Sequence, residues 1–304
     1  MVESSILLLT KNGACDLERL LPAVYSQRDV APFEVIAIDS GSTDATLDVL
    51  RRFPVRLQQI KPQDFHHART RNLAAGLACG RILVFLSQDA IPASDAWLRT
   101  LISNFDDPKV AAVYGRQFPK PDSSVEREDA LDTIYGGQKV IKDPAHRNGI
   151  GYRFYHFSDV NAAIRRTVWQ EEPFPENLKI FEDLGIAKKI LDRGWKIVYD
   201  PQAAVFHSHS HTTLGLFKRY FDIGYTLRIL DIWQAPGTRQ SMLRDICKLT
   251  QNKLRRARHQ QTRESARHGI KQDIAKSFGL FLGLNEMLLP LALKRRLSAY
   301  DVFG

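Results

Sequence analysis

Polar side chains that could bind a phosphorylated ligand follow several apolar stretches of this 304-residue chain. Asp39 ends the run EVIAID, and small residues follow it in SGST. A carboxylate there can accept hydrogen bonds from a uracil or thymine ring or from ribose hydroxyls, and small residues let a nucleotide approach the backbone. Gln88 and Asp89 follow the run RILVFLS, where a carboxylate can bind Mg²⁺ or Mn²⁺ bridged to a diphosphate. Each pattern alone is also typical of a capped turn.

Two helix starts carry further charged groups. Arg71 lies in FHHARTRN, in the first turns of an expected helix, where its guanidinium and the helix N-terminus could both face a diphosphate. Glu182 and Asp183 open another helix, and a general base must be a carboxylate or imidazole that reaches the attacking hydroxyl. Adjacent acids point in different directions, so one can face a site while the other anchors the loop. A solvated arginine and two acids that favour a helix N-terminus remain the plain alternatives.

Three histidines alternate in HSHSH, directly after an apolar run: His207, His209 and His211. Imidazole nitrogens bind transition metals, and alternate residues of an extended segment lie on one side. A lone histidine is more often structural, but three at this spacing favour at least one metal ligand.

The elements that must position these groups alternate between strand and helix. Strands are predicted at Ser5–Thr10, Glu34–Asp39, Val55–Ile60 and Arg81–Ser87, then at Val160–Ile164, Trp195–Tyr199 and Ala203–His207. Helices are predicted at His66–Cys79, ended by Gly80, and at Glu182–Arg193, and Ser42 or Thr43 is expected to cap a helix after the second strand. The order predicts an α/β fold with a mostly parallel sheet, whose ligands bind at the carboxyl ends of the strands. Thr10, Asp39 and Asp89 fall at such ends. Residues 120–157 are expected to form a long loop or helical insertion over the site.

The net charge of +9 is unevenly distributed along the chain. From Thr212 onward there are 17 Lys and Arg against 7 Asp and Glu, whereas the preceding residues are nearly neutral. This helical, basic last third could bind an anionic membrane, or it could be a cap with a solvated face. Nucleic acid is not an expected partner, because the basic stretch has almost no aromatic residues for base stacking.

Several other classes of protein are disfavoured. Cys15, Cys79 and Cys247 are too far apart for a zinc site or a disulfide framework, and their apolar neighbours predict small core residues in a reducing compartment. The first apolar run is too short for a signal peptide. Phe278 to Leu293, the most apolar later stretch, is interrupted by polar residues and Pro290, so we expect no membrane span.

Taken in order, these motifs resemble the inverting family-2 glycosyltransferases of the GT-A fold. The resemblance covers roughly residues 4–225 and rests on the segments ILLLTKN, IDSGSTDAT, FHHARTRN, LSQDAIP, FEDLGIAKKILDRGWKIVYDP and AVFHSHSH. It implies a catalytic domain over residues 1–211, with a nucleotide-sugar half at about 1–118 and an acceptor half at about 119–211. The basic helical region then occupies residues 212–304.

The resemblance also implies roles for individual residues. Thr10 and Asp39, with Ser42 and Gln88 beside them, would hold the nucleotide, and Arg71 would contact the diphosphate, as Arg219 would more loosely. Asp89 would bind Mg²⁺ or Mn²⁺ together with His207 or His209, and Asp183 would be the catalytic base. The chain departs from the family's Asp-X-Asp motif, because Ser87 replaces the first acid. Metal binding would therefore rest on Asp89, a histidine, water and the diphosphate.

The segments HHARTRN and SQDA resemble the rhamnosyltransferase branch, which uses dTDP-L-rhamnose to build bacterial surface polysaccharides such as O-antigen. A dTDP- or UDP-sugar would be the donor, and a glycan, such as one linked to polyisoprenyl diphosphate, would be the acceptor. The enzyme would be cytoplasmic and peripheral on the inner face of the membrane. The alternative from another class is a catalytically silent nucleotide-sugar or glycan-binding module in a polysaccharide assembly complex.

Overall fold

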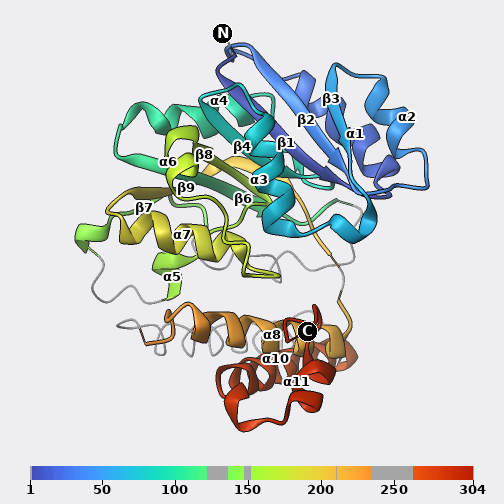
Figure 1. Cartoon of the computed structure of the whole chain (residues 1–304), viewed down its shortest axis with the longest axis vertical. Helices are drawn as coiled ribbons and strands as arrows, with labels where there is room; N and C mark the ends of the chain where they lie inside the picture. Colours follow the sequence, from blue (N-terminus) through green and yellow to red (C-terminus); the bar gives the residue numbers. More distant parts are fainter. Residues whose placement is uncertain (1, 122–135, 147–151, 210, 235–262, 304) are drawn as a thin grey trace. The chain divides into compact units, whose positions relative to one another are not determined.

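The protein is described by a computed structural model, which covers residues 2–121, 136–146, 152–209, 211–234 and 263–303, with side chains from residue 269 in the last range. The chain divides into two compact units (Figure 1). The first unit comprises Met1–His146, Phe157–Asn177 and Glu182–His209. The second unit comprises Arg147–His156, Leu178–Phe181 and Ser210–Gly304.

The first half of the sheet is parallel, as the sequence predicts. Strands β1 (Ser4–Thr10), β2 (Phe33–Asp39), β3 (Val55–Gln59) and β4 (Ile82–Ser87) lie in the order β3-β2-β1-β4. β1, β2 and β4 are buried along most of their length, which explains why their apolar runs are continuous and not alternating. In the register of β1 and β2, Thr10 is the partner of Asp39. The carboxyl ends of these strands therefore bring the predicted polar residues to one edge.

The second half of the sheet is mixed. Strand β8 (Asn161–Arg165) lies antiparallel between β4 and β6 (Val110–Phe118), and β6 is parallel to β9 (Lys196–Phe206). Short strands β5 (Ile91–Pro92) and β7 (Val140–Lys142) add antiparallel edges to β9. The two strands predicted between residues 195 and 207 are thus one strand, and β6 was not predicted. The overall class, a GT-A-like sheet with flanking helices, is confirmed.

Helices flank this sheet in the first unit (Figure 1). They are α1 (Ala14–Tyr25), α2 (Thr46–Arg51), α3 (His67–Leu77), α4 (Trp97–Ser103), α6 (Arg166–Glu171) and α7 (Glu182–Asp192), with short 3-10 turns η1 (Pro62–Asp64), η2 (Asn104–Asp106) and η4 (Pro144–His146). The helices predicted at residues 66–79 and 182–193 are confirmed as α3 and α7. Trp97 is fully buried in the main core, and its indole N–H donates to Asn161 Oδ1 at 2.8 Å.

Three local predictions were wrong. Helix α2 is not capped by Ser42 or Thr43. The residue that precedes it is Ala45, which makes no side-chain cap hydrogen bond, and Asp44 Oδ1 accepts from Thr46 N at 3.0 Å. Helix α3 ends at Leu77, so Gly80 does not end it. Glycine is required at position 80 for close approach to β1, because a Cβ there would lie 2.6 Å from the Ser4 carbonyl carbon.

The cysteines are the third case. Cys15 and Cys79 are exposed and unbridged, not core residues, and Cys247 lies outside the described residues. The apolar side of α1 is formed by Leu17, Leu20, Leu21 and Val24, and Cys15 lies off that side. Apolar neighbours in sequence therefore did not predict burial, because helical period decides which side chains face the core.

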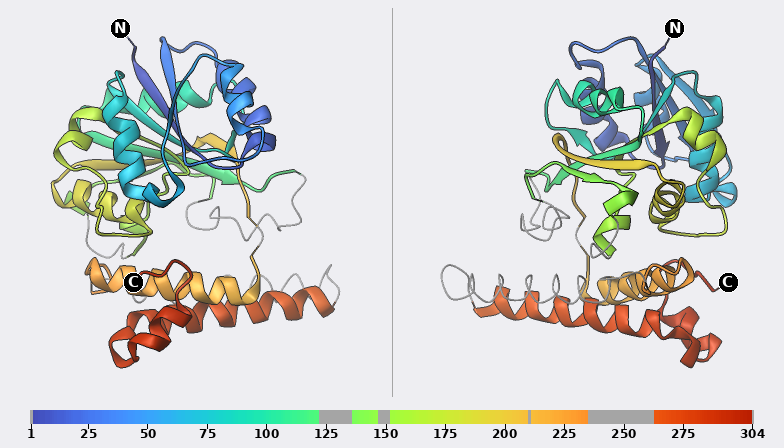
Figure 2. Two further views of the ribbon diagram at one scale, coloured as in Figure 1. Left: turned by 45° about the vertical axis from the view of Figure 1, so that its right-hand side comes forward. Right: turned by 90° about the vertical axis from the view of Figure 1, so that its left-hand side faces the viewer.

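The second unit is helical. It contains α5 (Tyr152–Tyr155), α8 (Thr213–Ile229), α10 (Arg263–Leu284), η5 (Glu286–Leu288) and α11 (Leu291–Leu297). Helices α8 and α10 lie side by side (Figure 2), and their backbones approach closely at glycines. A Cβ at Gly279 would lie 2.2 Å from Phe217 O, and one at Gly283 would lie 1.9 Å from Phe221 O. Within the described residues, no helix combines the length and the hydropathy needed to cross a membrane.

Candidate functional site

A cavity of about 240 Å³ opens at the carboxyl ends of β1 and β4. Thr10, Arg71, Gln88 and Asp89, all predicted from the sequence, line it together with Asp159, which was not predicted. Gln88 closes one side, because its Oε1 accepts from Lys11 N at 3.0 Å and its Nε2 donates to Lys11 O at 3.1 Å. The parallel half of the sheet therefore brings four expected residues into one hollow.

Asp39 is not among the residues that line this cavity, and it holds the loop that follows β2. Its Oδ1 accepts from Gly41 N and Ser42 N, both at 3.0 Å. Its Oδ2 accepts from Ser42 Oγ at 2.5 Å and from Thr10 Oγ1 at 3.2 Å. These four hydrogen bonds match the acceptor capacity of a carboxylate, so Asp39 fixes the loop geometry in this structure. A direct contact of Asp39 or Ser42 with a nucleoside stays a prediction.

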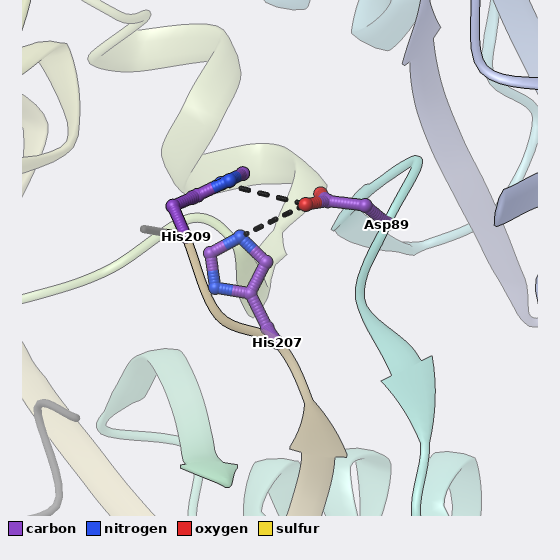
Figure 3. Close-up of side chains that lie close together, drawn as sticks. All are labelled: Asp89, His207 and His209. Carbon is purple, nitrogen blue, oxygen red and sulfur yellow. Dashed lines mark ion pairs between the residues drawn. The ribbon is translucent and has the colours of Figure 1, made fainter. Parts of the chain in front are cut away.

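Asp89, His207 and His209 form a compact cluster (Figure 3). Asp89 Oδ2 lies 3.5 Å from His207 Nε2 and 3.4 Å from His209 Nε2, and the three atoms lie within 4.8 Å of one another. The carboxylate comes from the turn after β4, and the histidines come from the segment after β9. One oxygen and two imidazole nitrogens at these spacings fit the ligand set of a divalent transition metal such as Mn²⁺.

A second layer of contacts orients His207. Its Nδ1 lies 3.0 Å from Gln117 Oε1, and Gln117 Nε2 donates to Ser158 Oγ at 3.0 Å. An amide oxygen accepts, so Nδ1 donates to it, and a neutral ring then offers its Nε2 lone pair on the side of Asp89. The residues therefore fit a bound metal ion.

Lys120 brings positive charge to the same place. Its Nζ lies 2.8 Å from Asp16 Oδ1 and 3.9 Å from Asp89 Oδ2. Sequence reasoning missed Lys120 because it lies in a stretch interpreted as loop, and it missed Gln117 because strand β6 was not predicted. The apolar run VAAVY before Gly115 was the available signal for that strand.

Arg71 faces two carboxylates. Its Nε lies 2.6 Å from Asp159 Oδ2, its Nη2 donates to Asp159 Oδ1 at 3.0 Å, and its Nη1 donates to Glu182 Oε1 at 2.5 Å. Asp159 and Glu182 are both buried. One cation thus serves two anions, and this charge balance opposes the predicted contact of Arg71 with a diphosphate, which stays untested.

Asp183 belongs to the same charged cluster. Burial raises the pKa of its carboxyl well above the usual range, and the carboxylates of Asp159 and Glu182 raise it further. Leu184 N donates to its Oδ1 at 2.7 Å. Burial also raises the pKa of Asp159 to about 6, although the Arg71 guanidinium opposes that shift. A carboxylate with a raised pKa is better matched to taking a proton near neutral pH.

Two residues singled out in the sequence belong to the second unit. Arg219, on α8, donates to Tyr300 Oη at 2.9 Å and lies over the Phe181 ring at 5.5 Å. His211 is exposed in the segment before α8. The predicted role of Arg219 near the diphosphate stays a prediction.

Comparison with known proteins places this geometry in a family. A sequence model of glycosyl transferase family 2 matches residues 5–171. The chain is 34% identical over 223 residues to the O-antigen chain rhamnosyltransferase RfbN of Salmonella typhimurium, covering 72% of this chain and 71% of that protein. It is 37% identical over 202 residues to the O-antigen chain rhamnosyltransferase WbaN of Salmonella anatum, covering 66% and 64%.

Solved structures support the same fold at lower identity. The mannosyltransferase PcManGT from Pyrobaculum calidifontis, in complex with GDP-Man and Mn²⁺, aligns with a TM-score of 0.59 at 18% identity, covering 99% of this chain and 77% of that one. S. aureus TarS 1–349 in complex with UDP aligns with a TM-score of 0.56 at 18% identity, covering 73% and 64%. The matched family model spans β1 to α6, which carry most of the cavity. The chain therefore belongs to glycosyl transferase family 2 and is a glycosyltransferase.

Proposed function

We propose that this protein transfers L-rhamnose from dTDP-L-rhamnose to a growing polysaccharide or lipid-linked glycan, with inversion at the anomeric carbon and with a bound divalent metal. The observation that carries the proposal is the position of Asp89, which lines the cavity of about 240 Å³ and also lies beside His207 and His209. The names of the two Salmonella relatives support rhamnose as the sugar and an O-antigen-like glycan as the acceptor.

The proposed reaction is a single displacement. Asp183 takes the proton of the acceptor hydroxyl, and that oxygen forms a bond to the anomeric carbon while the bond to the diphosphate oxygen breaks. The electron pair leaves with the diphosphate. A divalent cation held by Asp89 and the histidines would neutralise the charge that grows on the diphosphate. Lys120, 3.9 Å from Asp89, adds positive charge at the same end of the cavity.

The direct test is turnover of dTDP-L-rhamnose by the full-length protein, measured as released dTDP with Mn²⁺, with Mg²⁺ and with EDTA. We expect turnover that needs the metal and binding of dTDP that is tighter than that of UDP or GDP in calorimetric titrations. Turnover unaffected by EDTA would contradict the metal assignment. Preference for a UDP- or GDP-sugar would contradict the donor.

A matched pair of variants localises the metal. Asp89→Asn removes the charged ligand and should abolish the gain from Mn²⁺. Asp16→Asn removes a carboxylate that contacts Lys120 but neither histidine in the described contacts, so it should keep the metal response. Equal effects of the two substitutions would show that Asp89 acts through general charge and not through metal binding.

The second unit supports a proposed location at an anionic membrane surface. Large apolar side chains of α10 and its continuation are exposed, including Phe278 at 55%, Phe281 at 59% and Leu288 at 83%. Close packing of α10 on α8 uses glycines, which leaves these side chains on the outer surface. The exposed basic residues Arg295 and Arg296 follow on α11, where Lys294 is paired with the buried Glu286. Apolar groups beside cations match a lipid interface with anionic head groups, where each basic residue contributes about 1 kcal/mol.

Vesicle flotation tests this location. The full chain should float with phosphatidylglycerol vesicles and much less with phosphatidylcholine vesicles. Phe281→Glu combined with Leu288→Glu should reduce flotation, whereas Ile141→Glu, an exposed apolar residue of the first unit, should not. Flotation that is the same for all three proteins would contradict the proposed surface.

A further inference from the structure

A buried ion cluster connects three elements of the first unit. Arg71 comes from α3, Asp159 lies just before β8, and Glu182 is the first residue of α7. All three guanidinium nitrogens lie within 3.0 Å of a carboxylate oxygen of Asp159 or Glu182. The planar guanidinium group of an arginine, with its paired N–H donors, fixes the direction of the carboxylates that it contacts. This cluster therefore sets the start of α7, where Asp183 follows Glu182.

The cluster holds more carboxyl groups than cationic groups. Asp159, Glu182 and Asp183 are three carboxyls, and Arg71 is the guanidinium that faces them. His67 Nδ1 lies 3.9 Å from Glu182 Oε1 and 3.4 Å from Arg71 Nη1, so it can add charge when protonated. The backbone N–H of Leu184 also points at Asp183. A diphosphate placed against Arg71 would add negative charge beside three carboxyl groups that already share this guanidinium.

We propose that Arg71 and Asp159 are positioning residues for the base Asp183: Arg71 holds Asp159 and Glu182 beside Asp183, and it acts on these carboxylates and not on the diphosphate. The inference rests on the proposed function, because it gives the cluster the task of preparing the base of that reaction. It assigns a role to Asp159, and it replaces the contact with the leaving group that the family resemblance suggests for Arg71.

The physical effect is on proton affinity. A negative neighbour makes it harder for Asp183 to lose its proton and makes the ionised form a stronger base, whereas a positive neighbour does the opposite. Asp159 therefore strengthens the base, and Arg71 limits the effect while it keeps Asp159 and Glu182 in place. The two residues have opposite electrostatic effects on Asp183, so their removal should shift the pH profile in opposite directions.

The experiment is the pH dependence of kcat/KM for dTDP-L-rhamnose turnover by the full-length protein with Mn²⁺. This ratio falls at acidic pH as the base of the uncomplexed enzyme becomes protonated. Asp159→Asn should move the acidic limb to lower pH by about one unit, and Arg71→Gln should move it to higher pH by about one unit. Below the limb, one unit is about a tenfold change in the ionised fraction of the base.

Arg71→Lys is the conservative variant. Lysine keeps the positive charge but lacks the paired N–H donors of the guanidinium group. The acidic limb of the Arg71→Lys pH profile should therefore lie between those of the wild-type protein and Arg71→Gln. Titration of dTDP into each variant separates binding from proton transfer. We expect dissociation constants within about threefold of the wild-type value, because a one-unit shift in proton affinity does not require a change in nucleotide contact.

Three results would overturn the inference. The first is a loss of turnover at every pH with no shift of the limb. The second is a tenfold or greater loss of dTDP binding in Arg71→Gln with an unchanged pH profile, which would mark a diphosphate contact. The third is a shift of both substitutions in the same direction. If Arg71→Gln does not fold, Asp159→Asn and Arg71→Lys still give the two required directions.

Asp183→Asn separates this inference from the proposed function. Wild-type turnover by that variant would refute Asp183 as the base, and with it the proposed mechanism. An inactive Asp183→Asn protein together with unshifted Arg71 and Asp159 variants would refute the positioning role and leave the proposed mechanism standing.

Discussion

Replacement of Asp39 by alanine should strongly destabilise the first unit. The Asp39 side chain is fully buried, and its carboxylate accepts four hydrogen bonds from the loop after β2 and from β1. Alanine removes both oxygens, so two backbone N–H groups and two hydroxyls lose their acceptor. The hydroxyls of Ser42 and Thr10 can rotate toward other acceptors, whereas the N–H groups of Gly41 and Ser42 are fixed by the backbone.

The magnitude follows from those two fixed donors. A hydrogen bond to a charged group contributes about 1.5–3 kcal/mol, so Asp39→Ala should lower the free energy of unfolding by about 3–6 kcal/mol. Asp39→Asn keeps Oδ1 and therefore both backbone hydrogen bonds. Its Nδ2 would face two hydroxyls that can accept, so we expect a loss of about 1 kcal/mol.

Urea unfolding, followed by tryptophan fluorescence, measures the difference. Asp48→Ala is the matched control, because Asp48 is exposed and its ion pair with Arg51 at 3.0 Å contributes at most about 1 kcal/mol. If Asp39→Ala and Asp39→Asn were destabilised equally, the two backbone hydrogen bonds would not be the main contribution and the reasoning would be refuted.

Three further predictions concern the fold. Asn161→Leu leaves a buried indole N–H and a buried carbonyl without partners and should cost about 3 kcal/mol of unfolding free energy, measured in urea; a loss below 1 kcal/mol would contradict this. Gly283→Ala places a methyl 1.9 Å from a carbonyl oxygen of α8 and should lower the midpoint of thermal unfolding, whereas Gly76→Ala, with open space around it, should raise it slightly; equal midpoints would count against the close helix contact. Cys15 and Cys79 should both react with a thiol reagent in the native protein, and loss of those two equivalents in a double serine variant checks the assignment.

The parallel half of the fold could be predicted because burial on both faces leaves a clear signal. The continuous apolar runs of β1, β2 and β4 differ from any surface strand, and each ends at a polar residue. The edge where Thr10, Gln88 and Asp89 meet follows from parallel pairing alone. The pairing of Asp89 with His207 or His209 was expected from the family resemblance, and in the structure both histidines lie beside Asp89.

The mixed half of the sheet left weaker signals. Strand β9 was divided in the prediction because Asp200-Pro201-Gln202 is typical of a turn. In the structure a register irregularity between Gly115 and Gln117 of β6 lies opposite this stretch of β9, which accommodates the proline within one strand. Local residue preference was thus overridden by pairing with a distant strand.

The ion cluster around Arg71 could not be predicted from the sequence. Asp159 is 88 residues from Arg71, and Glu182 is 111 residues away, so no spacing rule links them. Asp159 precedes a strand in a polar stretch and has no local feature that separates it from an ordinary loop acid. The sequence indicated Arg71 as a phosphate ligand because it lies near a helix start, but the tertiary fold places two carboxylates against it.

The central claim is that Asp183 is the base of a metal-assisted glycosyl transfer. Turnover of dTDP-L-rhamnose by Asp183→Asn, measured beside dTDP binding, tests it most directly. General base catalysis contributes about 10²–10⁴-fold, so turnover should fall by at least about 100-fold while the dissociation constant for dTDP stays within about threefold. Turnover near the wild-type rate, with intact binding, would contradict the claim.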